Sequence, residues 1–205
     1  MKFLKYISTC LLMLSAAGCW GMQRLALQRP LVLSDMTIEH TKEPFDFGSD
    51  DINELIDVKY KDQDRVYKIG YLECSVINIQ KPKHIVKKFT DRRLSCKDAK
   101  NNKGEVFELC EGCKKVIVID YITINDHYQQ QGLGRSFLGY FLKYVKDAYP
   151  QSIIFLMPMQ KFAKNETNFH CSKEELQERL VNFYKSFGAR YLKFSDVWMY
   201  ISVKK

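Results

Sequence analysis

The chain has no apolar run long enough to span a bilayer comfortably, which argues against an ordinary transmembrane helix. It has no internal repeat and no low-complexity tract, so we expect one folded domain. No arginine-rich arm or recognisable RNA-binding motif accompanies its net charge of +8, so nucleic acid is allowed by charge but unsupported by motif. What the chain does have is 205 residues, 46% apolar and 13% aromatic, enough for one full core.

The cysteines do not form a disulfide pattern. Apart from those in the first nineteen residues there are five, an odd number at irregular spacing. Cys110-Glu111-Gly112-Cys113 could be half a zinc site with Cys96 or with His170-Cys171. The strand-like runs Glu105–Leu109 and Lys114–Ile119 on either side favour a hairpin turn instead. We therefore expect no metal.

The first nineteen residues read as a secretory signal. Lys2 and Lys5 flank the start of an apolar stretch that ends in small residues. Cys19 follows Ala-Gly, which resembles the bacterial lipobox, although Ala16 stands where that motif prefers Leu. The resemblance implies lipidation of Cys19 and an exported, membrane-anchored protein; a chance apolar N-terminus on a cytoplasmic protein is the alternative. The expected organisation is a signal (1–19), a tether (20–33) and one domain (34–205).

A glycine-bearing loop between a strand and a helix is the most informative stretch. The β-branched run Val116–Ile124 reads as a buried strand. After the loop, Leu133, Phe137, Leu138, Phe141, Leu142, Val145 and Ala148 recur at helical spacing. A strand, a short loop with glycines and a helix start together favour phosphate binding, because free backbone N–H groups and the helix dipole converge there.

The spacing of the glycines in the loop indicates which class of phosphate-containing ligand to expect. Gly134 is followed by Arg135-Ser136, which excludes a Walker loop, and Phe137 stands where a dinucleotide fingerprint needs a third glycine. What remains is Gln-x-x-Gly-x-Gly, formed by Gln129, Gly132 and Gly134. This motif resembles the acetyl-CoA pyrophosphate loop of the GNAT N-acetyltransferase superfamily. An ordinary strand–turn–helix with glycines for packing is the alternative.

The resemblance implies a fold. It is an α/β (α+β) domain with a mixed, mostly antiparallel central sheet and helices on both faces, in the order β-α-β-β-β-α-β-α-β-β. Two central strands splay apart in this fold, and the pantetheine arm lies in the opening. The expected elements are a strand at 36–40, a helix from Ser49, one or two strands in 65–79, a loop at 81–103, a strand at 116–124, a helix ending before Pro150, a strand at 152–157, a helix from Ser172 to Gly188 and strands at 190–194 and 198–203.

The resemblance also implies which residues meet the co-substrate, acetyl-CoA. Backbone groups at the end of the fourth strand would stabilise the carbonyl oxygen during attack. The loop amides would hold the diphosphate, with Arg135 near a phosphate. The expected binding residues are Ile122, Thr123, Ile124, Gln129, Gln130, Gln131, Gly132, Leu133, Gly134 and Arg135.

Two residues are candidates for proton transfer. Phe183-Tyr184-x-x-x-Gly188 resembles the second GNAT signature, in which the tyrosine is a general acid that protonates the departing CoA thiolate. Gln177 stands where the family often has Asn, which puts the pantetheine contact from this helix in doubt. Asp120, expected on the same side of its strand as Ile122 and Ile124, is a candidate general base for the amine, with a water chain as the alternative.

The acceptor is harder to identify. Phe45-Asp46-Phe47-Gly48 and the helix expected after it resemble GNAT toxins that acetylate aminoacyl-tRNA, with Phe47 in place of a cysteine. Three hypotheses stand: an acetyltransferase acting on a primary amine by direct attack in a ternary complex, a toxin-like enzyme acting on aminoacyl-tRNA, and an inactive CoA-binding lipoprotein. The first is preferred. A homodimer is also open.

Overall fold

The computed structural model describes residues 32–44, 51–62, 64–79, 96–158, 172–193 and 195–203. From Leu33 onward these residues belong to one compact unit, Leu33–Lys205. The signal and nearly all of the tether lie outside the described residues. Within the described ranges, no helix combines the length and the apolar character needed to cross a membrane.

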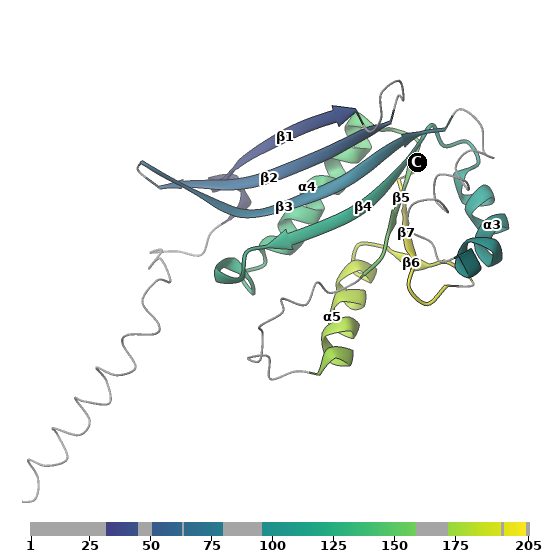
Figure 1. Cartoon of the computed structure of the whole chain (residues 1–205). Helices are drawn as coiled ribbons and strands as arrows, with labels where there is room; N and C mark the ends of the chain where they lie inside the picture. The colour runs from purple at the N-terminus through teal and green to yellow at the C-terminus, as the bar shows by residue number, and fades with distance from the viewer. Residues whose placement is uncertain are drawn as a thin grey trace, which may run out of the picture. The chain divides into compact units, whose positions relative to one another are not determined.

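One seven-stranded sheet organises the domain (Figure 1). The strand order is β1-β2-β3-β4-β5-β7-β6, and β4–β5 is the parallel pair while the other neighbours are antiparallel. The strands are β1 (Thr37–Pro44), β2 (Ile52–Asp62), β3 (Arg65–Asn78), β4 (Lys115–Ile124), β5 (Ser152–Leu156), β6 (Arg190–Tyr191) and β7 (Met199–Ser202). The predicted mixed, mostly antiparallel sheet is confirmed.

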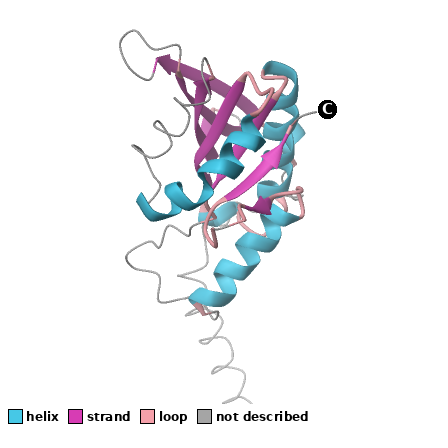
Figure 2. Cartoon of the chain, turned by 90° about the vertical axis from the view of Figure 1, so that its right-hand side faces the viewer, coloured by secondary structure: helices cyan, strands magenta, loops and turns pink. Residues whose placement is uncertain are grey.

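Helices lie on both faces of this sheet, as predicted (Figures 1 and 2). The described α-helices are α3 (Cys96–Cys110), α4 (Leu133–Ala148) and α5 (Lys173–Lys185), with short 3-10 turns η1 (Leu33–Asp35) and η2 (Asp126–Tyr128). The predicted stripe of α4 is buried at Leu133, Phe137, Leu138, Phe141 and Val145, whereas Leu142 is half-buried and Ala148 exposed. On the opposite face, Val106 and Cys110 of α3 pack with Val116 and Val118 of β4.

The helix predicted from Ser49 is wrong, because residues from Ile52 onward form β2. Glu54, Ile56 and Val58 are buried while their neighbours are half-buried, which is the period of two that a strand requires. Glu54 at a core position hid this alternation, since a carboxylate is rarely fully buried. The toxin resemblance thus loses the helix on which it partly rested; Phe45–Gly48 lie outside the described residues.

The strand predicted at Glu105–Leu109 is also wrong, and the predicted loop at 81–103 ends within a helix. Both overlap α3, whose buried Val106 and Cys110 are spaced by one helical turn. Glu111-Gly112 is a turn, with φ +70° at Gly112, but it joins a helix to β4 and is not a hairpin. Cys110 and Cys113 are buried thiols and not part of a disulfide, and the described residues contain no metal-binding cluster.

α5, the helix before the last two strands, begins as predicted, but the side chains that it buries are not the predicted ones. Ser172 and Glu175 form the expected capping box, and Gly188 has φ +85°. The side chains of α5 that are buried are Val181 and Tyr184. The predicted buried stripe is only half-buried; it comprises Leu176, Leu180, Phe183 and Phe187.

Candidate functional site

The loop before α4 presents unused amides. Gln130 and Gly132 have φ of +61° and +77°, which turns the backbone sharply. The first bond within α4 runs from the Ser136 amide to the Gly132 carbonyl, so the amides of residues 133–135 precede it. The amides of residues 130–132 donate to no backbone carbonyl of the described residues. An anion with several oxygens could therefore be bound here.

Gln129 supports the loop rather than extending from it. Its Nε2 donates to the Ile124 carbonyl at 2.9 Å and to Asp126 Oδ1 at 2.6 Å. These bonds join the end of β4 to the turn that begins the loop. Gln129 therefore holds the loop against the strand, a role that the motif alone does not reveal.

Beyond Ile119, β4 has no described partner on its β5 side, because their pairing ends at Ile119–Leu156. The Asn125 amide donates to Ile69 of β3. Backbone groups alternate in direction along a strand, so those of Thr123 also point toward β3, while those of Ile122 and Ile124 point to the side without a described partner. Of the three predicted strand residues, Ile122 can offer its N–H and carbonyl to a ligand and Ile124 its N–H, because the Ile124 carbonyl already accepts from Gln129.

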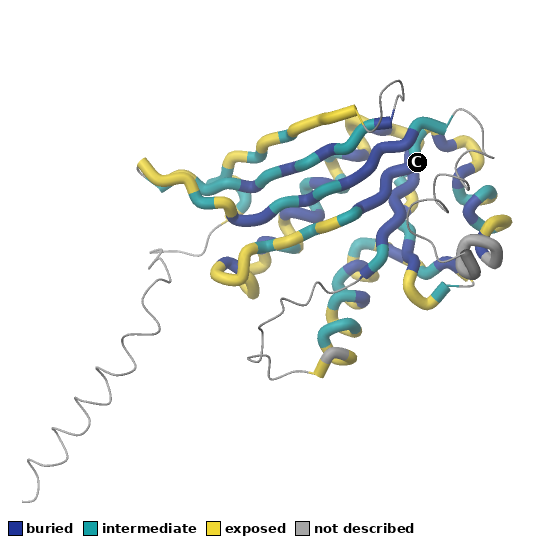
Figure 3. Tube along the Cα trace, in the orientation of Figure 1, coloured by how far each residue is buried: buried dark blue, intermediate teal, exposed yellow. Residues whose placement is uncertain are grey.

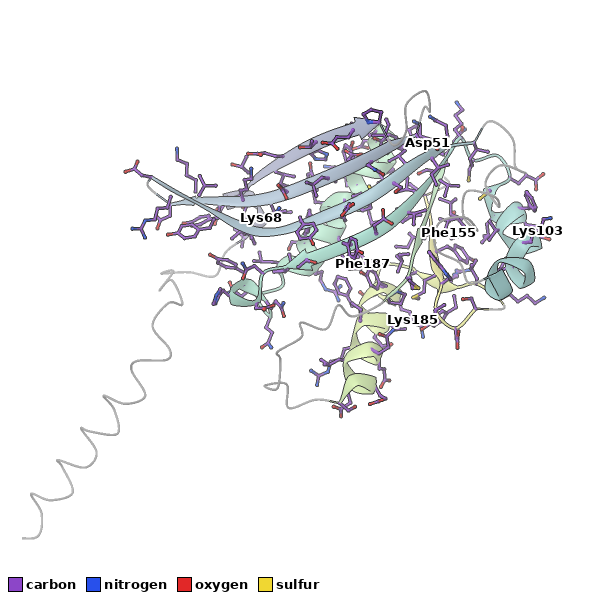
Figure 4. The ribbon with its side chains drawn as sticks, viewed as in Figure 1. Asp51, Lys68, Lys103, Phe155, Lys185 and Phe187 are labelled. Carbon is purple, nitrogen blue, oxygen red and sulfur yellow. The ribbon has the colours of Figure 1, made fainter. Side chains whose placement is uncertain are left out.

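Contacts near its two ends tie α5 to β5 and to α4. Gln177 near the start of α5 donates from Nε2 to the Pro158 carbonyl at the end of β5, at 2.5 Å. At the other end, Phe187 lies beside α4, with the Arg135 guanidinium carbon 5.4 Å from its ring centroid. Figure 4 shows Phe187 and Lys185 at this end of α5. Gln177, uninformative in the sequence, thus anchors α5 to β5.

Tyr184 is the buried tyrosine of α5. It is 4% exposed, and burial raises the pKa of its phenol to about 12. Its ring meets Phe183 edge-on, with centroids 5.2 Å apart. Among the described residues its hydroxyl has no hydrogen-bond partner. The phenol thus stays protonated at neutral pH and can donate to a ligand atom.

Asp120 faces the other way from the prediction. The β3–β4 register shifts between Glu73 and Cys74, so Asp120 is an extra residue in a β-bulge. Its Oδ2 accepts from Ser75 Oγ at 3.0 Å, and Ser75 pairs with Val118 on the face that α3 covers farther along. Ile124 instead lies against Gly134 of α4. The bulge separates Asp120 from Ile122 and Ile124, because it breaks the strict alternation of side chains.

Comparisons with known proteins add little. No protein-family model and no curated protein matches this chain. One similar solved structure is the loading GNATL domain of CurA from Lyngbya majuscula, at 13% identity and a TM-score of 0.36, covering 74% of this chain and 76% of that one. A similarity this low does not carry a functional assignment, which therefore rests on the residues described above.

Proposed function

We propose that this chain is an acyltransferase that moves an acetyl group from acetyl-CoA to a primary amine by direct attack in a ternary complex. The observation that carries the proposal is the run of amides at residues 130–135 that donate to no backbone carbonyl of the described residues. They follow the part of β4 beyond Ile119, which has no described partner on its β5 side. The diphosphate fits the amides, and an extended pantetheine arm fits a strand edge that offers the backbone of Ile122 and Ile124.

The chemistry requires two proton transfers. The amine nitrogen bonds to the acyl carbon, the carbon–sulfur bond breaks, and the sulfur takes a proton. Tyr184 is suited to give that proton, since burial keeps it protonated until pH 12 is approached. The proton lost by the amine goes to Asp120, directly or through water. Backbone N–H groups of Ile122 or Ile124 stabilise the charge on the acyl oxygen.

Binding and turnover of acetyl-CoA test this proposal. Acetyl-CoA at a hundred times its Kd should raise the free energy of unfolding of the full chain by about 2.7 kcal/mol. Acetyl transfer to a panel of primary amines should release free CoA, measured by thiol titration. Stabilisation without turnover on any amine would replace the enzyme with the CoA-binding alternative. Absence of both effects would remove the proposal.

The location remains a proposal as well. We propose that the chain is exported and lipidated at Cys19, which lies outside the described residues. Fatty-acid labelling of the full chain in bacteria should depend on Cys19, with Cys10→Ser as the matched control. Equal labelling of Cys19→Ser and the unaltered chain would overturn lipidation at this residue.

A further inference from the structure

We propose that the acceptor binds on the sheet face opposite α4 and is a small amine carrying at least two ammonium groups. This inference rests on the proposed acetyl transfer and deepens it by naming the substrate class. It begins from the part of the face formed by β2, β3 and the end of β4.

No described helix covers this part of the sheet. Figure 1 shows α4 behind β2 and β3, and none of the described helices in front of them. α3 packs farther along the sheet, in a cluster with Ile77 of β3, Val116 and Val118 of β4, and Ile153 and Phe155 of β5. Leu55 and Tyr71 are half-buried and Tyr121 is 41% exposed, in agreement with the teal and yellow segments of Figure 3. Apolar and aromatic surface is therefore open to a ligand.

The strand register arranges side chains on this face in rows. Leu55, Glu73 and Tyr121 are direct neighbours across β2, β3 and β4. Tyr71 and Asp57 are paired in the next row. Cross-strand neighbours have Cβ atoms about 5 Å apart, so Glu73 stands between an aliphatic and an aromatic side chain with a second tyrosine close by.

This face is acidic although the chain as a whole carries +8. Five carboxylates share it with three lysines, a formal charge of −2. Lys59 is paired with Glu39 at 2.5 Å and Lys68 with Asp57 at 2.7 Å. Glu73 has no ion-pair partner among the described residues. The charged residues of this face are Glu39, Glu43, Asp57, Glu73 and Asp120, with Lys59, Lys61 and Lys68.

A carboxylate flanked by tyrosines suits an ammonium group. Lys68 already places its ammonium nitrogen 4.8 Å from the centroid of Tyr71, so this surface accepts a cation on an aromatic ring. An ammonium of the acceptor would lie at Glu73, beside Tyr71 and Tyr121. A second amine would then reach Asp120 on the neighbouring strand.

The separation of these carboxylates sets the size of the acceptor. Side chains in adjacent rows are roughly 5–7 Å apart. That distance suits two amines joined by a short alkyl chain, one bound by Glu73 and the other reacting beside Asp120. A polyanion such as tRNA would be repelled by the same carboxylates, which disfavours the aminoacyl-tRNA alternative.

The test compares putrescine, a diamine with four carbons, with butylamine, a monoamine of equal length, using the full chain and acetyl-CoA. We expect kcat/KM to be at least about ten times higher for putrescine. Glu73→Gln should raise KM for putrescine about tenfold, with little change in kcat and no change for butylamine. Glu108→Gln, on the exposed side of α3, is the matched control and should change neither.

The outcomes separate the two proposals. Turnover without preference for putrescine, or an equal effect of Glu73→Gln on both amines, overturns this inference and leaves the acetyl transfer standing. A higher kcat/KM with aminoacyl-tRNA than with putrescine also overturns it. Absence of turnover with every acceptor overturns the proposed function and this inference together. A thermal melt of Glu73→Gln shows whether the variant is folded.

Discussion

Individual residues in this protein show how burial changes chemistry. Tyr184 illustrates this for the proposed reaction, because burial raises the pKa of its phenol to about 12 and so keeps it protonated to a higher pH than an exposed phenol. We predict that Tyr184→Phe lowers kcat by about a hundredfold or more and leaves the Kd of acetyl-CoA unchanged, since the ring remains and only the donor is lost. Stopped-flow turnover and calorimetric binding measure the two quantities.

Tyr191→Phe is the matched control for this prediction, because Tyr191 is half-buried and lies on β6. It should leave both quantities unchanged. Normal turnover of Tyr184→Phe would remove this phenol from the mechanism.

Glu54 is the second residue whose burial has consequences. Its carboxylate is 0% exposed and accepts hydrogen bonds from Tyr144 at 2.5 Å and Tyr149 at 2.9 Å. His40 Nδ1 lies 2.9 Å away, and Lys42 Nζ 3.7 Å away. These groups come from β1, α4 and the residue that follows α4. A buried carboxylate therefore connects the edge strand to the helix.

We predict that Glu54→Gln lowers the free energy of unfolding by about 3 kcal/mol. The neutral amide is a weaker acceptor, and the cationic Lys42 loses its counter-charge. Urea denaturation measures the change. Glu39→Gln, which breaks only the solvent-screened pair with Lys59, should lower the free energy of unfolding far less. Equal effects of the two substitutions would contradict a special role for the buried carboxylate.

At the scale of elements, the two glycines before and within the start of α4 have different roles. Gly132 has φ +77°, whereas Gly134 is helical and a Cβ there would meet Ile124 at an ordinary 3.9 Å. We predict that Gly132→Ala destabilises the fold by about 1 kcal/mol because of its left-handed backbone. Gly134→Ala should be neutral or stabilise by up to about 1 kcal/mol. Thermal denaturation compares them.

A larger loss for Gly134→Ala than for Gly132→Ala would contradict the backbone geometry of the loop. The same two substitutions also distinguish effects on stability from effects on acetyl-CoA binding. Gly132→Ala should also weaken acetyl-CoA binding, since it shifts the amides of the loop, and the Kd of each folded variant measures this.

The bulge in β4 is the other decisive element. It turns Asp120 toward the open face, from which the acceptor is proposed to arrive. The Ile124 side chain lies on the opposite face, near Gly134 of α4. Donor and acceptor can therefore approach the reacting centre from different directions. A strand without the extra residue would place Asp120 among the side chains under α4.

At the scale of the whole molecule, one buried and one half-buried tyrosine make the free energy of unfolding fall at alkaline pH. Burial raises the pKa of Tyr184 to about 12, and burial with the hydrogen bond to Glu54 raises that of Tyr144 further. The unfolded value is near 10. Because the folded state holds these protons more tightly, their stabilising effect is complete below pH 10 and is lost as the pH rises through the folded values.

We predict that the free energy of unfolding falls from pH 9.5 to about 12 and that Tyr184→Phe flattens part of this fall. Urea denaturation at intervals across this range measures it. Tyr121→Phe, at an exposed position, should leave the slope unchanged. An identical slope for Tyr184→Phe and the unaltered chain would show that the pKa of this phenol is the same in the folded and unfolded states.

The sequence alone determined the features that depend on near neighbours. The β-branched run of β4, the glycines, the apolar stripe of α4 and the capping box of Ser172 each act over a few residues, so their patterns predicted the strand–loop–helix and the start of α5 correctly. The order of the last strands and the mixed sheet followed from the same local signals together with the resemblance to GNAT proteins.

The tertiary structure decided whatever depends on distant partners. Residues 52–56 fit a helix by spacing, but pairing with β1 and β3 and burial of Glu54 beneath α4 make them a strand. The bulge at Asp120 arises from the register between β3 and β4. Which side of α5 is buried depends on the elements against which this helix packs. Local periodicity cannot specify such outcomes, because the free energy of burial depends on surfaces brought together from far along the chain.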